Sequence, residues 1–93
     1  MTTPKELIAN GALVIDVRST EEWNAGHLPN AKHLPVGDVA RRLDDVEEWT
    51  GGDKDKIVVV YCSAGSRSGR ARTALMAAGY KNVVNGGGLK SLL

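Results

Sequence analysis

Residues 57–61 constrain the fold more than any other segment, because five consecutive apolar residues there lead directly into the chain's only cysteine, Cys62. The first four, an isoleucine and three valines, are β-branched, and a run of this kind predicts a buried strand. On either side, short apolar runs alternate with segments of helical spacing. Because that alternation is typical of parallel sheets covered by helices, we expect an α/β fold with residues 57–61 as its central strand.

Capping signals and chain-breaking residues place the other elements. A capping box at residues 3–6, with proline at the first helical position, predicts a helix over residues 4–10. A second capping box at residues 19–22 begins a short helix that Gly26 ends. A helix should follow the Cys62 loop, since small or apolar residues recur there at helical spacing and Gly79 follows: Ala71, Ala74, Leu75 and Ala78. The remaining expected elements are strands at 13–15, 32–34 and 82–84, a helix at 37–49 and a final turn at 89–93.

The composition fits one soluble domain spanning residues 1–93. Hydrophobic residues make up 42% and charged residues 25% of the chain, and a net charge of +1 gives no reason to expect nucleic acid or a membrane as a partner. No apolar stretch approaches the roughly 20 residues of a membrane span. We expect a monomer. Because the N-terminus lacks the features of a signal peptide, we expect a cytoplasmic protein, or a periplasmic one if an upstream signal peptide has been removed.

The cysteine and histidine counts limit the chemistry. One cysteine excludes an internal disulfide and a metal site made of cysteines alone. The two histidines, His27 and His33, are too few for a convincing zinc site, and no HExxH, CxxC or Walker pattern occurs. We therefore expect chemistry that needs neither a metal ion nor an organic cofactor.

Cys62 is the candidate catalytic residue because of its place in the pattern. The carboxyl end of a parallel strand, facing the start of a helix, is where α/β proteins place ligands. The residues that follow, 63–66, are small, so their backbone N–H groups can converge on one point and stabilise an anion. Such a nest favours the thiolate, which is the nucleophilic form of cysteine. The alternative is an inert buried cysteine.

Arg67 is the candidate ligand for an oxyanion, because a guanidinium forks onto oxyanions in a way that lysine cannot. The alternative is a surface arginine on the first turn of the helix. Ser63, Ser66 and Ser68 are candidate hydroxyl donors to a bound anion, although Ser66 or Ser68 could equally cap the helix. Gly65 is expected to supply a positive φ or a close approach of the backbone.

Several groups of residues resemble the signatures of rhodanese-like domains. They are residues 14–18, 22–23, 26–31 and 34–35 for the N-terminal signature, 60–68 for the active-site loop, and 79–83 and 86–90 for the C-terminal signature. The similarity covers nearly the whole chain, in order and at suitable spacing. It is greatest to small single-domain thiosulfate sulfurtransferases, including those of the phage-shock type.

This resemblance implies a rhodanese-like fold, with a central parallel five-stranded sheet flanked by helices on both faces. It also implies a ping-pong reaction in which Cys62 takes a sulfane sulfur from thiosulfate or another persulfide donor. The acceptor would be cyanide or a thiol, such as glutathione or thioredoxin. The implied substrate-binding residues are those of the loop: Ser63, Ala64, Gly65, Ser66, Arg67 and Ser68. Many members have an aromatic residue near the last helix, and Leu92 in its place puts the packing of the C-terminus in doubt.

Loop length separates sulfur chemistry from phosphate chemistry. Four residues separate Cys62 from Arg67, whereas cysteine phosphatases that share the fold use Cys-x5-Arg, a longer loop that accommodates phosphate. A phosphatase or arsenate reductase is therefore disfavoured. The main alternative to an enzyme is a non-enzymatic persulfide relay or regulatory module.

Other polar residues near the predicted site are assigned structural roles. We expect Arg18 to form a buried or half-buried ion pair with Glu22 rather than to bind an anion. His27 is expected to bond a loop backbone rather than to act as a base. Arg70 and Arg72 are expected to be solvated, where they would draw anions towards the site.

Overall fold

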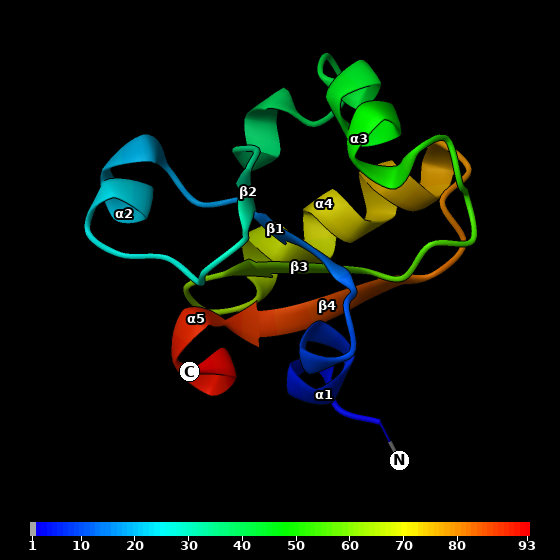
Figure 1. Ribbon diagram of the computed structural model, residues 1–93. Helices are drawn as coiled ribbons and strands as arrows, with labels where there is room; N and C mark the ends of the chain where they lie inside the picture. The colour runs from blue at the N-terminus through cyan, green and yellow to red at the C-terminus, as the bar shows by residue number, and fades with distance from the viewer. Residues whose placement is uncertain (1) are drawn as a thin grey trace.

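Four segments form one parallel sheet in the computed structural model, which describes residues 2–93 (Figure 1). The strands lie in the order β2-β1-β3-β4 and are β1 (Leu13–Asp16), β2 (Lys32–His33), β3 (Val58–Cys62) and β4 (Val83–Gly88). All three pairings are parallel. The expected central strand is confirmed, because β3 lies between β1 and β4 and each of its five residues is buried.

The expectation of a five-stranded sheet is wrong for this chain, because only four segments between residues 2 and 93 pair as strands. The segment before β1 cannot add another strand, since the Thr3–Glu6 capping box forms and Pro4 begins α1 (Pro4–Ala9). Proline has no N–H to donate to a sheet, and its φ suits the first helical turn. After β4 the chain turns directly into α5 (Leu89–Leu92).

The remaining helices follow the predicted pattern with one division. They are α2 (Thr20–Asn24), the 3-10 helix η1 (Val36–Asp38), α3 (Leu43–Thr50) and α4 (Ser66–Ala77). The single helix expected over 37–49 is thus divided into η1 and α3. Pro35 and Gly37 are poor helix formers. In addition, the Val36 N–H donates to the Val17 carbonyl at 3.0 Å, which fixes the backbone at the start of η1.

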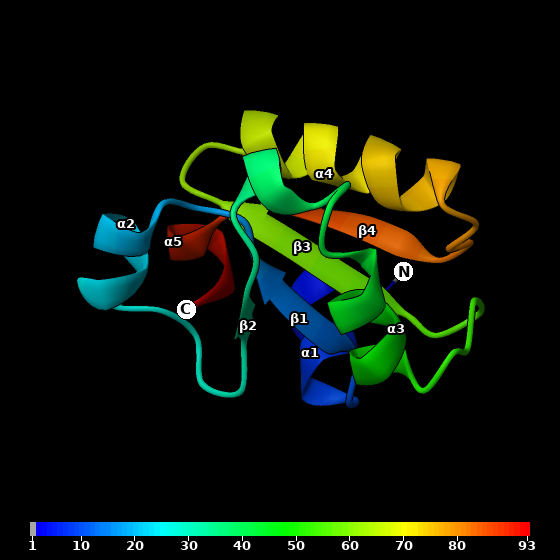
Figure 2. The same cartoon turned by 90° about the horizontal axis from the view of Figure 1, so that it is seen from above.

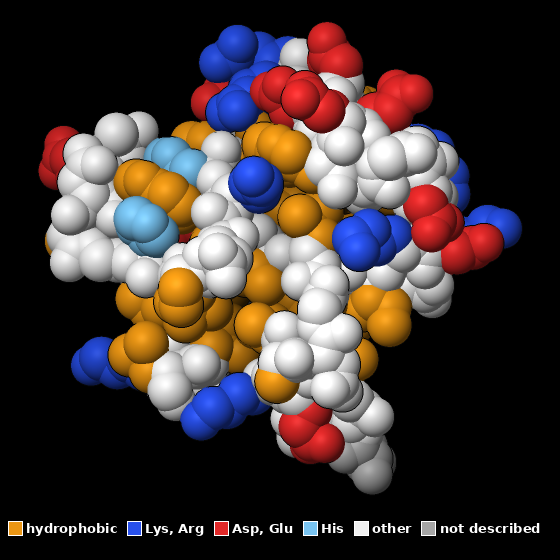
Figure 3. Space-filling model, viewed as in Figure 1, with side chains coloured by type: hydrophobic (Ala, Val, Ile, Leu, Met, Phe, Trp, Pro, Cys, Tyr) orange, Lys and Arg blue, Asp and Glu red, His pale blue; other side chains and the backbone are white. Residues whose placement is uncertain are grey.

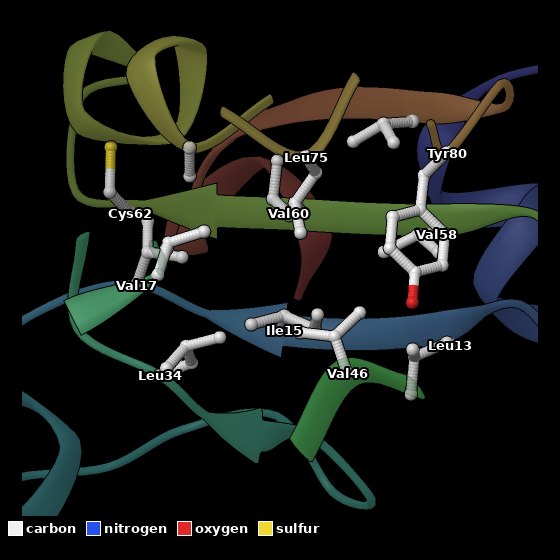
Figure 4. Packing of buried hydrophobic residues seen from close by; sticks show 13 residues of the cluster. Leu13, Ile15, Val17, Leu34, Val46, Val58, Val60, Cys62, Leu75 and Tyr80 are labelled. Atoms are coloured by element: carbon white, nitrogen blue, oxygen red, sulfur yellow. The ribbon is translucent and has the colours of Figure 1, made fainter. Parts of the chain in front are cut away.

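Helices cover the sheet on both faces, unevenly (Figure 2). The longest helix, α4, lies over one face together with η1 and α3, and the short helices α1 and α5 lie on the other. The larger hydrophobic cluster fills the α3 and α4 side, where side chains of β1 and β3 meet those of the helices (Figure 4). In the same view Cys62 stands at the end of this row, with its sulfur directed towards the start of α4.

The C-terminus is packed despite the absence of the expected aromatic residue. Leu92 is 7% exposed and belongs to a second cluster with Val14, Leu28 and Tyr61. The short helices α1 and α5 cover this face of the sheet incompletely, and Figure 3 shows hydrophobic side chains at the surface between them. No helix in the described chain has the length and apolarity needed to cross a bilayer.

Candidate active site

Cys62 ends β3, and three residues separate it from the first turn of α4. The side chain is buried at 1% exposure. Gly65 has φ 96°, which confirms the positive φ expected there, and it serves as the N-cap residue of α4. Its conformation turns the chain so that the Gly65 N–H points back at the Cys62 Sγ, 3.0 Å away.

The glycines of β4 allow the loop to pack this tightly. A Cβ on Gly88 would lie 2.2 Å from the carbonyl oxygen of Ser63, and a Cβ on Gly65 would lie 3.5 Å from the Cα of Gly87. The loop therefore rests on bare backbone of the neighbouring strand. Gly88, the last residue of β4, is thus a steric requirement of the cysteine loop.

The hydrogen-bond donors around the Cys62 sulfur change its pKa more than burial does. Burial alone raises the pKa of the Cys62 thiol, but the Ser68 hydroxyl and the N–H groups of Ser68, Ala64 and Gly65 favour the thiolate. Together they lower the pKa of Cys62 from its ordinary 9.0 to about 7. About half of the cysteine is then ionised near neutral pH, which suits a nucleophile.

Ser68 is fully buried, and its hydroxyl lies between several acceptors. Its Oγ is 3.4 Å from the Cys62 Sγ, 3.1 Å from the Gly65 carbonyl and 2.6 Å from Asn85 Oδ1. One hydroxyl proton can serve only one of these at a time. The short distance favours Asn85 when the sulfur is a thiol, whereas a thiolate is the stronger acceptor. Neither Ser66 nor Ser68 caps α4, so the alternative of a serine cap is wrong.

Asn85, which the sequence pattern did not single out, ties the loop to β4. Its Nδ2 donates to the Gly65 carbonyl at 3.0 Å, and its Oδ1 accepts from the Gly87 N–H at 2.9 Å as well as from Ser68. Its side chain thereby supports two of the residues that donate to the sulfur, Gly65 and Ser68. The only sequence signal was a polar residue in an apolar strand, directly before three glycines.

Arg67 points from the first turn of α4 towards α2 and pairs with Glu22. Its Nη1 lies 2.6 Å from Glu22 Oε1 and its Nη2 lies 3.0 Å from Oε2. Ser63 donates its hydroxyl to the same carboxylate at 2.8 Å. Bonds from Arg67, Ser63 and Ser19 hold the pKa of Glu22 well below its usual range.

The expected ion pair between Arg18 and Glu22 is wrong. Arg18 instead binds Asp16, with its Nη2 at 2.7 Å and its Nε at 3.0 Å from Asp16 Oδ2, and it also donates to the Gly26 carbonyl. Both members are buried, and the bond to Asp16 raises the pKa of Arg18. Arg18 pairs with Asp16 because the two residues are only two positions apart at the end of β1, so their side chains lie side by side. Because Asp16 engages Arg18, Glu22 pairs with Arg67 instead.

The other predicted residues surround this centre. Ser63, Ala64 and Ser66 are exposed on the loop, so a ligand can reach them. His27 bonds to backbone as expected, but its partner is the carbonyl of Trp23 in helix α2, 2.9 Å from Nδ1, rather than a loop. Arg70 and Arg72 are exposed, as expected for solvated side chains, and Arg72 Nε also donates to the Val83 carbonyl at 2.7 Å.

The histidines add no metal site to this arrangement. His27 stacks on Trp23 at 3.4 Å, and Figure 3 shows both histidines near α2. Within residues 2–93, no group of three or more histidine, cysteine or acidic side chains is placed to hold a metal ion. The donors around Cys62 offer the chemistry of a buried, readily ionised thiol.

Comparisons with known proteins agree with the loop geometry. A family model described as "Rhodanese-like domain" matches residues 3–91. The thiosulfate sulfurtransferase PspE of Escherichia coli is 38% identical over 78 residues, covering 84% of this chain and 71% of that protein. The candidate sulfur carrier protein YrkF of Bacillus subtilis is 33% identical over 77% of this chain, which matches 36% of its length. A solved structure described as rhodanese with anions from E. coli has a TM-score of 0.76 and 37% identity, covering 87% of this chain and 91% of that chain.

Proposed function

The chain belongs to the rhodanese-like sulfurtransferase family, and from that membership and the geometry around Cys62 we propose that it is a thiosulfate sulfurtransferase. Cys62 carries the transferred sulfur as a persulfide. The observation that carries this proposal is the convergence of the Gly65 N–H, at 3.0 Å, and the Ser68 hydroxyl, at 3.4 Å, on a single buried sulfur. These donors favour the charged form of the sulfur on which both half-reactions depend.

In the first half-reaction the Cys62 thiolate attacks the outer sulfur of thiosulfate. A new S–S bond forms to Cys62, the S–S bond of thiosulfate breaks, and its electron pair leaves with sulfite. With the pKa of Cys62 at about 7, the thiolate is available without a general base. The proposal therefore assigns no base role to His27, whose Nδ1 lies 2.9 Å from the Trp23 carbonyl.

In the second half-reaction a thiophilic acceptor, cyanide or a thiol, attacks the outer sulfur of the persulfide. The bond to Cys62 breaks and the thiolate returns as the leaving group. The donors that stabilise the thiolate for attack therefore also stabilise it as it departs. Ser63, Ala64 and Ser66 lie exposed around the loop, where donor and acceptor would approach. We assign the binding of the donor's oxygens to Arg67, whose two Nη atoms contact Glu22 when no donor is bound.

A persulfide relay is the second candidate, and three observations favour it. Cys62 is only 1% exposed, and Glu22 engages the fork of Arg67. One relative is named as a candidate sulfur carrier. A relay would accept sulfur from a partner protein and turn over thiosulfate slowly.

Initial-rate kinetics with thiosulfate as donor test the proposal. The acceptors are cyanide, glutathione and reduced thioredoxin, and the control is Cys62→Ser. An enzyme gives parallel double-reciprocal lines, as expected for ping-pong transfer, and no turnover in the variant. Turnover no faster than the Cys62→Ser background with every acceptor would reject the enzyme in favour of the relay. Hydrolysis of a phosphate ester that depends on Cys62 would instead indicate the phosphatase chemistry that the loop length disfavours.

A further inference from the structure

Glu22 reaches the active-site loop from a different part of the fold. It lies in α2, yet both of its carboxylate oxygens contact the loop residues Arg67 and Ser63. The two oxygens meet the two Nη atoms side by side, which is the arrangement in which arginine binds a planar oxyanion. The carboxylate thus occupies the edge of Arg67 that a donor's oxygens would use.

The carboxylate is also held in place by its own helix. Glu22 Oε1 accepts hydrogen bonds from the Ser19 N–H at 3.1 Å and from its hydroxyl at 3.0 Å, completing the capping box of α2. Withdrawing Glu22 from Arg67 would therefore disturb the start of α2. The pair is partly open to solvent, with side-chain exposures of 30% for Arg67 and 34% for Glu22, so a ligand can reach it.

Pairing leaves little net positive charge beside the sulfur. Arg67 is neutralised by Glu22, and Arg18 is neutralised by Asp16 at 2.7 Å. The Cys62 thiolate then adds a negative charge. Arg70, exposed on α4, has no ion-pair partner among the described residues, but it lies beside Val36 and Gly37 rather than at the Glu22 edge. A doubly charged donor at that edge would be repelled by the Glu22 carboxylate and the Cys62 thiolate. The Arg67 guanidinium, which it would share with Glu22, would be the only positive group there, within residues 2–93, to offset this repulsion.

We propose that Glu22 is a specificity-determining residue, which competes with the donor for Arg67 and shifts the preference from doubly charged thiosulfate towards sulfane-sulfur donors of lower charge. This inference rests on the proposed function, since it concerns which donor reaches Cys62. Singly charged thiosulfonates and persulfides are the favoured class. They need less compensation by the guanidinium and are repelled less by the carboxylate.

The test compares Glu22→Gln with the matched control Glu21→Gln, an exposed neighbour on the same helix turn. Glutamine retains the capping-box oxygen, so α2 is preserved while the charge is removed. The donors are thiosulfate and methanethiosulfonate, which both transfer their outer sulfur to Cys62 and release sulfite or methanesulfinate. We expect KM for thiosulfate to fall about two- to fivefold in Glu22→Gln, in line with a partly exposed ion pair. KM for methanethiosulfonate should change less, and Glu21→Gln should alter neither.

Binding measured without turnover separates this inference from the proposed function. In a Cys62→Ser background, calorimetric titration with thiosulfate should give a lower Kd when Glu22 is also replaced by glutamine. An unchanged or higher Kd, together with an unchanged donor preference, would overturn the role of Glu22. If the wild type forms the persulfide but its donor preference is the same as that of Glu22→Gln, only this inference fails. If wild type forms no persulfide with either donor, the proposed function itself fails.

Discussion

Replacing Ser68 with alanine should raise the pKa of Cys62. The lowering from 9.0 to about 7 corresponds to about 2.7 kcal/mol of preferential stabilisation of the thiolate. Ser68 Oγ is one of several donors to Sγ, at a long 3.4 Å, so its share lies at the low end of the roughly 1.5–3 kcal/mol for a hydrogen bond to a charged group. We therefore expect the pKa of Cys62 in Ser68→Ala to rise by about one pH unit, to about 8.

The pH dependence of iodoacetamide alkylation measures this pKa directly. The rate rises with pH as the thiolate forms, so its midpoint should be near 7 in the wild type and near 8 in Ser68→Ala. At pH 7 the variant should react about fivefold more slowly. The control is Thr73→Ala, which removes a hydroxyl from α4 that donates to the Gly69 carbonyl and does not contact the sulfur.

Two results would refute this reasoning. A wild-type midpoint near 9 would mean that the loop does not stabilise the thiolate. A midpoint that stays near 7 in Ser68→Ala would mean that the hydroxyl proton remains on Asn85, the acceptor at 2.6 Å, and that the backbone N–H groups act alone.

Three further substitutions test the packing of the site and of the core. Gly88→Ala would place a Cβ 2.2 Å from the Ser63 carbonyl oxygen. We therefore expect thermal unfolding to show that the free energy of unfolding falls by about 1–3 kcal/mol, and the pH dependence of alkylation to show a raised pKa of Cys62. Arg18→Ala leaves the buried Asp16 carboxylate unpaired, and urea unfolding should show a loss of about 3–5 kcal/mol. Tyr80→Phe removes a buried hydroxyl that has no hydrogen-bond partner, so urea unfolding should show unchanged or increased stability, by up to about 1 kcal/mol.

Matched variants control these measurements. Gly37→Ala adds a Cβ with nothing within 4 Å and should leave Cys62 unaffected. Arg41→Ala breaks an exposed pair with Asp38 and should cost less than about 1 kcal/mol. If Arg18→Ala and Arg41→Ala lowered the free energy of unfolding equally, the buried ion pair would stabilise the fold no more than the exposed one. A clear destabilisation by Tyr80→Phe would mean that the hydroxyl makes a bond that the structure does not contain.

The strands and the cysteine loop could be predicted because their signals are local. The β-branched run fixes β3, the capping boxes fix the starts of α1 and α2, and Gly65 fixes the turn after Cys62. The number of strands could not be taken from a family resemblance, because Pro4 and its capping box commit the N-terminal segment of this chain to a helix.

The partners of the charged residues were harder to predict because they depend on tertiary distances. The sequence places Glu22 four residues from Arg18, but the fold brings it to Arg67, 45 positions along the chain. Asn85 likewise reaches the loop only because β4 lies beside β3, where a shift in register places Cys62 opposite Gly88. No periodicity in the sequence encodes either contact.

The most direct test of the central claim is the intact mass of the protein after reduction, desalting and incubation with thiosulfate. The account predicts a gain of one sulfur, about 32 Da, that disappears on addition of cyanide and is absent from Cys62→Ser. A wild-type mass that does not change, or a gain that persists in Cys62→Ser, would contradict the proposal that Cys62 carries the transferred sulfur.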